Sequence, residues 1–163
     1  MSTKTSAAPV RWLNSDEERA WRAFRRMVIA VQTGTGRDLA DAGLSEPDYE
    51  VLSTLSERPG HTSTLHEQAA KMGWSRSRLS RHATRMEARG LLERAPDPAD
   101  GRGCLLVLTE HGLDTLKSAA PAHVASVRRH FIDRLTPEDL IALEAIARRL
   151  EAYDSTPPPR RTR

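Results

Sequence analysis

The stretch that decides the fold runs from Thr64 to Thr109 and reads TLHEQAAKMGWSRSRLSRHATRMEARGLLERAPDPADGRGCLLVLT. Its pattern predicts a short helix, a tight turn, a second helix rich in arginine, and then two short strands joined by a loop that contains Asp-Gly. This order is typical of a winged helix-turn-helix, a unit whose second helix enters the major groove of DNA. Double-stranded DNA is therefore the first partner to consider.

The predicted second helix, from Ser75 to Arg89, separates a packing face from a polar face. At about 100° per residue, Leu79, Ala83 and Met86 fall in one narrow sector. The opposite side carries short hydroxyl side chains and arginines: Ser77, Ser80, Arg81, Thr84 and Arg85. Short side chains let the backbone approach DNA, while arginine reaches guanine edges or phosphates. With Ser75 as its cap and Gly90 at its end, this helix is about 21 Å long, enough to lie across a major groove.

The positive charge of the chain is local. The 163 residues include 25 basic and 22 acidic side chains, a net charge of only +3. Between Ser75 and Arg89, however, the one acidic residue is Glu87, against five arginines: Arg76, Arg78, Arg81, Arg85 and Arg89. A charge run alone is more often an ordinary solvated helix face. Here the neighbouring elements favour DNA binding over that alternative.

These neighbouring elements have their own signals. Thr64 and Glu67 have the spacing of a capping box, which predicts that a helix begins there. Gly73 suits the tight turn into Ser75, because glycine adopts a positive φ without strain. Downstream, the short apolar runs 91–95 and 104–109 are separated by a loop rich in proline, aspartate and glycine, which predicts a hairpin with Arg102 exposed at its tip.

Four of these motifs, in this order and at these separations, resemble the MarR family of bacterial transcription regulators. They are residues 74–81, 86–91, 100–102 and 108–112, and the resemblance extends over about residues 12 to 152. It implies a homodimer that binds a pseudo-palindromic operator and responds to a small molecule. One departure is Gln68, where members of the family commonly carry leucine, and it raises a question about local packing.

The resemblance also implies roles for individual residues. The arginine-rich helix would read the major groove, and Arg102, oriented by Asp100, would contact the minor groove. Together with the helical pattern, this gives the predicted DNA-binding set: Ser75, Arg76, Ser77, Arg78, Ser80, Arg81, Thr84, Arg85, Asp100 and Arg102.

Helical patterns also flank the central unit. A first helix is expected from Ser15, with a kink or break at Gly34 and Gly36, and a second from Leu44 to Leu55. After Thr109, apolar residues recur at intervals of three and four positions from Leu113 through Phe131 to Leu135. Pro121 is expected to bend or interrupt this stripe. Residues 136–139, Thr-Pro-Glu-Asp, open a last helix.

The long apolar stripes are most simply explained by pairing between two subunits, although packing within one chain is an alternative. We therefore predict a mainly α fold with a small β-hairpin wing, in one domain over residues 10–155. Within it, the winged helix-turn-helix spans about 44–109, and the dimerisation helices span about 12–42 and 110–153. Residues 1–9 are predicted to be a disordered tail, and 156–163 form a tail rich in proline and arginine.

In the MarR family, small-molecule effectors bind in a cleft between the dimer helices and the DNA-binding unit. This implies a small aromatic or amphipathic effector and a set of candidate lining residues: Trp12, Trp21, Phe24, Tyr49 and Leu113. The last four also fit ordinary core positions at helical spacing, which is the more common role of such residues. Trp12 precedes the first helix, so a staple or a lid is the alternative there.

Other classes of function find little support. The six histidines lack metal-binding spacing, and no catalytic or dinucleotide motif is found, so neither an enzyme nor a cofactor is expected. The single cysteine, Cys104, excludes an internal disulfide and opens an apolar strand; a redox-responsive regulator acting through it is one alternative, and a winged helix used for protein contact is another. With no signal peptide or membrane span, a cytoplasmic bacterial protein is expected.

Overall fold

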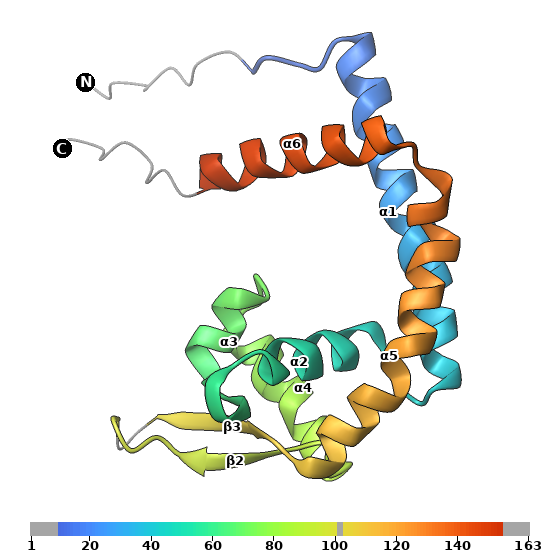
Figure 1. The fold of residues 1–163 in the computed structure, drawn as a ribbon. Helices are drawn as coiled ribbons and strands as arrows, with labels where there is room; N and C mark the ends of the chain where they lie inside the picture. The colour runs from blue at the N-terminus through green and yellow to red at the C-terminus, as the bar shows by residue number, and fades with distance from the viewer. Residues whose placement is uncertain (1–9, 101–102, 155–163) are drawn as a thin grey trace, which may run out of the picture.

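The computed structural model describes residues 10–100 and 103–154, and it contains helices and one small sheet (Figure 1). The elements are α1 (Ser15–Asp41), α2 (Glu46–Ser56), η1 (Pro59–His61), β1 (Thr62–Thr64), α3 (Leu65–Lys71), α4 (Arg76–Ala88), β2 (Leu92–Pro96), β3 (Cys104–Leu108), α5 (Glu110–His130), η2 (Ile132–Arg134) and α6 (Pro137–Asp154). The predicted fold class, a mainly α winged helix-turn-helix between long terminal helices, is confirmed. In the described ranges, no helix combines the length and hydropathy needed to cross a lipid bilayer.

The sheet has three antiparallel strands in the order β1-β3-β2. The predicted hairpin is β2 and β3, with Arg94 opposite Leu106. The third strand, β1, pairs Ser63 with the other side of Leu106 and was not predicted. Its three residues are Thr-Ser-Thr, too short and too polar to show the alternation that marks a strand.

The predicted helix signals of the central unit are confirmed. Thr64 and Glu67 form the reciprocal capping box of α3, and the Ser75 hydroxyl accepts from the Arg78 amide at the start of α4. Gly73 and Gly90 both adopt a positive φ, of 63° and 69°, in the turns that precede and follow α4. Local chemistry therefore fixes the ends of the helix-turn-helix.

The core lies between α2, α4 and β3. Leu52, Leu79, Met86 and Leu106 are fully buried there, so the predicted packing face of α4 is confirmed. Gln68 of α3 is also fully buried, and its amide nitrogen donates to the Thr54 hydroxyl of α2. A polar side chain at this position is thus accommodated by a hydroxyl on the facing helix.

Some predicted boundaries were wrong. Helix α2 begins at Glu46, not at Leu44, because the Ser45 side chain caps it while Leu44 is buried ahead of it. The apolar stripe after Thr109 does not stay on one helix, since α5 ends at His130 and leaves Phe131 and Leu135 outside.

Pro121 was expected to bend or interrupt this stripe. It does not interrupt α5, which runs unbroken through Pro121, but the helix axis changes direction between its two halves (Figure 1).

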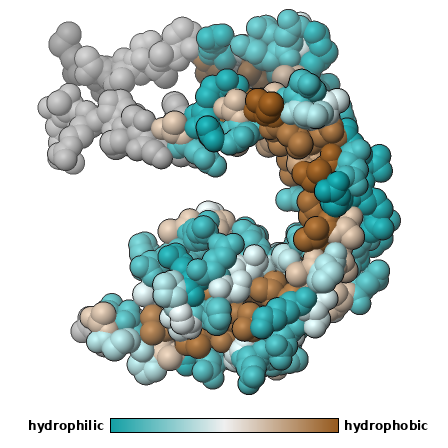
Figure 2. Space-filling view, in the orientation of Figure 1, coloured by the Kyte–Doolittle hydropathy of each residue, from teal (hydrophilic) through white to brown (hydrophobic). Residues whose placement is uncertain are grey.

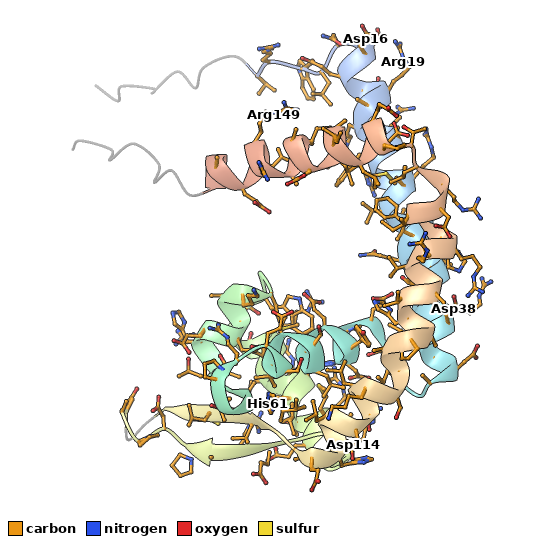
Figure 3. The ribbon with its side chains drawn as sticks, viewed as in Figure 1. Asp16, Arg19, Asp38, His61, Asp114 and Arg149 are labelled. Atoms are coloured by element: carbon orange, nitrogen blue, oxygen red, sulfur yellow. The ribbon has the colours of Figure 1, made fainter. Side chains whose placement is uncertain are left out.

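Of the kink or break expected at Gly34 and Gly36, the break is wrong, because α1 continues to Asp41. A Cβ atom built on Gly34 would lie 2.5 Å from the His130 ring of α5, so this glycine serves close helix packing. One turn further along α1 lies Asp38, which is labelled beside α5 in Figure 3. Its carboxylate accepts from Ser126, Arg129 and His130 of α5, at 2.5, 2.6 and 3.1 Å. The hydrogen bond from Ser126, followed by that from Arg129, lowers the pKa of Asp38 to about 2. Helices α1 and α5 therefore form one column, which we call the α1–α5 column.

The base of α5 is joined tightly to the wing. The Thr109 hydroxyl donates to the Gly90 carbonyl and accepts from the Gly112 amide. A Cβ on Gly112 would lie 1.9 Å from the Leu91 carbonyl oxygen, closer than atoms can approach. The end of α4, the hairpin and the start of α5 thus meet in one close-packed joint.

Helix α6 leaves the top of the α1–α5 column and projects above the winged helix-turn-helix unit (Figure 1). Its side chains are largely exposed, with Ile141 at 69% and Leu150 at 63%. Figure 2 shows hydrophobic surface along the column and near the root of α6. A single chain leaves this apolar surface uncovered.

The two neighbouring glycines of α1 give a matched test of the column. Gly34→Ala forces the added methyl group into the His130 ring, so we expect a loss of roughly 1 to 3 kcal/mol in unfolding free energy. Gly36→Ala meets only the Glu46 Cγ atom at 3.5 Å, and should be neutral or stabilising by up to about 1 kcal/mol, since alanine favours helix. Urea unfolding followed by circular dichroism measures both. Equal effects of the two substitutions would contradict the assigned role of Gly34.

Candidate DNA-binding surface

Helix α4 presents a long polar surface. Its buried residues are Leu79, His82, Ala83 and Met86, and its opposite side is exposed. The predicted residues on this helix are all exposed except the half-buried Ser80: Ser75, Arg76, Ser77, Arg78, Arg81, Thr84 and Arg85. The sequence therefore predicted correctly which side of α4 is accessible. His82, beside the packing face, is only 7% exposed.

Arg94 of β2 connects the wing to this surface. Its Nη2 donates to the Ser80 carbonyl at 2.8 Å and to the Thr84 hydroxyl at 3.2 Å, and its Nη1 lies 3.4 Å from the Glu87 carboxylate. Arg94 therefore neutralises the one acidic side chain of α4 and holds the hairpin against the helix. Sequence reasoning missed this residue, because its only signal was a basic side chain in a short strand.

Two arginines lie along the opposite edge of α4. The Arg78 guanidinium stacks 3.9 Å above the Trp74 ring, and Arg85 donates from Nη2 to His82 and from Nη1 to the Arg81 carbonyl. Such contacts reduce the freedom of long side chains before any ligand arrives. Among the residues that the structure describes, Arg81, between the two edges, stacks on no aromatic ring.

Asp48 of α2 holds the end of α4 from inside the protein. Its side chain is 7% exposed, accepts from the Ser45 amide at 2.9 Å, and accepts from Arg89 at 2.8 Å. Arg89 also donates to the Gly43 carbonyl at 2.6 Å. Burial by itself would raise the pKa of Asp48, but the hydrogen bonds from Ser45 and the Arg89 charge reverse this, so the pKa is lowered. The carboxylate is ionised and ties α4 to the loop between α1 and α2.

The tip of the wing is only partly described. The loop closes through the Gly103 amide, which donates to the Asp100 carbonyl at 2.7 Å, and Asp100 is exposed. Arg102, predicted to contact the minor groove, lies outside the described residues, so its role stays a prediction. Cys104 is half-buried at the start of β3, opposite Pro96, at the end of the hairpin next to the loop.

The five predicted effector residues are not brought together in the single chain. Trp12 is 83% exposed, and Trp21 stacks on Phe24 along α1 with both rings about half exposed. The interpretation of these two aromatic residues as core is therefore wrong for one chain. Leu113 and Tyr49 are both partly buried, and each packs against the core.

Tyr49 does line a cavity. Its ring lies 4.0 Å from that of His123 on α5, at the edge of a hollow of about 270 Å³ between α2 and α5. The other lining residues are Glu46, Glu50, Ser53 and Thr54. Two buried polar atoms, Glu46 Oε1 and His123 Nδ1, have no hydrogen-bond partner within the described part of the chain. Among the described residues, no group of histidine, cysteine and carboxylate side chains has the geometry of a metal site.

An arginine-rich helix after a tight turn, held against a three-stranded sheet, defines a winged helix-turn-helix of the DNA-binding kind. Residues 42–103 match the sequence model of the MarR family. The chain is 33% identical over 121 residues to transcriptional regulator HosA of Escherichia coli O111:H-, covering 72% of this chain and 86% of HosA. It belongs to the MarR family and is a DNA-binding transcriptional regulator, not an enzyme.

Solved structures agree with this assignment. AbsC of Streptomyces coelicolor, a MarR family regulator, is 44% identical with a TM-score of 0.79, over 88% of this chain and 99% of AbsC. Sco3205 of the same organism, solved in complex with DNA, is 34% identical with a TM-score of 0.85, over 94% of this chain and 97% of Sco3205.

Arg94 provides a test of how the wing supports α4. Arg94→Ala should weaken DNA binding by roughly 1 to 2 kcal/mol, because the hydrogen bonds to Ser80 and Thr84 are lost. The slope of log K against log[salt] should not change, since no phosphate contact is removed. Glu93→Ala, at the exposed neighbouring position, is the control and should bind as the parent does. A slope reduced by about one unit would instead assign Arg94 to a phosphate.

Proposed function

We propose that this protein is a homodimeric repressor that binds a pseudo-palindromic operator and leaves it when a small effector binds. The observation that carries the proposal is the exposed arginine face of α4, held from inside by Asp48 and from the wing by Arg94. These attachments give the helix one orientation relative to the rest of the chain, which reading a groove requires.

The residues of α4 divide into two groups. Ser77, Arg81 and Thr84 lie farthest from the buried face, so they are the candidates for contact with base edges. Arg76, Arg78 and Arg85 lie toward the edges of the exposed face, where phosphates flank the groove, and Ser75 and Ser80 accompany them. At the wing, Asp100 and Arg102 are proposed for the minor groove on the strength of the family resemblance.

Dimerisation is supported by the apolar surface of the terminal helices. The exposed large hydrophobic residues lie on or beside α1, α5 and α6: Val10, Trp12, Leu13, Trp21, Phe24, Ile29, Val124, Leu140, Ile141, Ile146 and Leu150. A soluble monomer rarely exposes such an extensive apolar patch. A second copy of the chain is the proposed cover, since two-fold pairing brings identical helices together.

The cavity beside Tyr49 is the proposed effector site. A flat ring would stack on the Tyr49–His123 pair, and a hydrogen-bond donor would satisfy Glu46 Oε1. Glu50, whose pKa is raised by burial, adds a second carboxyl group to the lining. The cavity therefore favours a small aromatic molecule that carries a donor or a positive charge. Since Glu46 and Asp48 belong to the same helix, a shift of α2 would reach α4 through Asp48.

Arg81 tests the reading role of α4. Arg81→Ala should cost about 1 to 3 kcal/mol on the selected operator and relax base preference at one position in each half-site. Parent binding should weaken with salt by about 0.9 log units per phosphate contact for each log unit of salt. Arg148→Ala, on exposed α6, is the control. Equal losses on operator and random DNA would show that Arg81 reads no sequence.

The spacing of half-sites tests the dimer. Two reading helices related by a two-fold axis engage half-sites about 10 base pairs apart, centre to centre. Inserting five base pairs turns one half-site to the far side of the duplex, so affinity should fall steeply, whereas ten should restore part of it. Sedimentation at micromolar concentration should give a dimer. A monomer, or affinity indifferent to spacing, contradicts the proposal.

Tyr49→Ala tests the effector site. Benzylamine, a small aromatic cation, should release the parent protein from its operator at lower concentration than benzoate, because the cavity is lined by two glutamates. Tyr49→Ala should lose this response and keep its DNA affinity. Ser118→Ala, which lines a separate hollow on α5, is the control. Release of the Tyr49 variant at the parent concentration would place the effector elsewhere.

A further inference from the structure

Three side chains form a chain of contacts from the interior of α2 to the exposed edge of α4. Asp48 Oδ1 lies 2.9 Å from His82 Nε2, and His82 Nδ1 lies 2.8 Å from Arg85 Nη2. Asp48 and His82 are both buried, whereas Arg85 is exposed. The buried pair thus supports one arginine of the DNA-binding surface.

The partners determine the protonation state of His82. A guanidinium only donates hydrogen bonds, so Nδ1 must accept from Arg85 and the ring proton must be on Nε2, beside the carboxylate. Nε2 lies 2.9 Å from Asp48 Oδ1 without the alignment of a hydrogen bond, so the carboxylate attracts the polar Nε2–H group electrostatically. His82 is therefore neutral in this arrangement.

The surroundings keep the ring in place and uncharged. Trp74 packs edge-on against His82, with 5.6 Å between ring centroids. A hollow of about 210 Å³ beside it is lined by Pro47 of α2, Trp74, and three arginines of α4: Arg78, Arg81 and Arg85. Burial, which outweighs the attraction of Asp48, and the charges of Arg85 and Arg78 lower the pKa of His82 below its usual 6.5. Arg89 acts on the ring indirectly, because it shares the Asp48 carboxylate.

Protonation of His82 makes its contact with Arg85 repulsive. A proton on Nδ1 removes the acceptor and places two donors, both positively charged, 2.8 Å apart. Asp48 holds the imidazolium where it is, so Arg85 is the group that must move. An arginine released in this way regains side-chain freedom that DNA binding must remove again.

We propose that His82 is a positioning residue for DNA binding: neutral and anchored by Asp48, it holds Arg85 in the orientation that engages the operator, and protonation of its ring releases Arg85. The inference rests on the proposed function in one respect, that Arg85 contacts the operator. It predicts that operator binding weakens as the pH falls. A histidine that simply adds positive charge beside DNA has the opposite effect and strengthens binding as the pH falls.

The experiment compares operator affinity between pH 5 and 8, at constant salt, for the parent and His82→Gln. Glutamine offers a donor and an acceptor but does not titrate, and the other five histidines are common to both proteins. Near pH 8 the two affinities should agree within about twofold. Toward pH 5 the parent should become roughly tenfold weaker than the variant. A constant ratio, or a parent that gains on the variant at low pH, overturns the proposal.

A double-mutant cycle at pH 8 tests the link to Arg85. His82→Phe keeps the ring and removes both nitrogens, so it should weaken binding roughly tenfold, and the loss should disappear in the Arg85→Ala background. Losses that add independently overturn the link. If circular dichroism shows that His82→Phe is unfolded, the cycle is repeated with His82→Leu. If that variant is unfolded as well, the pH comparison of the parent with His82→Gln decides. His111→Gln, at the exposed base of α5, is the control. If the parent protein binds no DNA at any pH, the result rejects the proposed function and not the link between His82 and Arg85.

Discussion

The arrangement of the DNA-binding unit depends on one buried carboxylate. Asp48 caps α2 with its Ser45 partner, receives the Arg89 guanidinium from the end of α4, and faces His82 from the middle of that helix. A buried charge is tolerated only where such partners compensate its desolvation. Asp48 needs these partners, and the partners in turn must take the positions that reach Asp48. Its hydrogen bonds therefore fix how α2, α4 and the loop around Gly43 meet. The orientation of α4 is thereby specified by contacts in the interior of the protein, away from its exposed arginine face.

The second constraint is the close approach of α1 and α5. Gly34 allows the His130 ring to lie against the α1 backbone, and Asp38 then collects its hydrogen bonds one turn later. A wider separation between the helices would lose both contacts. These contacts tie the two helices of the column together, and the winged helix-turn-helix is attached to the column through α2 and the joint at Gly112. The Tyr49–His123 cavity lies between α2 and α5, where the two parts meet.

Much of this could be predicted from the sequence where the cause is local. The capping box at Thr64, the cap at Ser75 and the positive φ of Gly73 each depend on residues within a few positions. The exposed face of α4 follows from helical periodicity in the same way. Family resemblance supplied the assignment to DNA, which no single one of these patterns carries.

What the sequence did not predict depends on contacts between distant segments. Gly34 has the same local signal as a helix break, and only the His130 ring, nearly a hundred residues away, explains why the helix continues. Arg94 and Asp48 look like ordinary surface charges until the hairpin and α2 are placed beside α4. Strand β1 exists because β3 offers it an edge. Sequence periodicity contains no information about such pairings.

The joint at Gly112 makes α5 a lever. With 21 residues the helix is about 30 Å long, so a tilt of about 5° at the top of the column corresponds to roughly 3 Å at its base. Gly112 has no side chain, so the base of α5 lies directly against the Leu91 carbonyl. No deformable side chain lies between them, so little of that displacement is lost at this contact. A movement of α5 is therefore expected to displace the hairpin and α4 together, by an amount that depends on the length of one helix and on the absence of one Cβ atom.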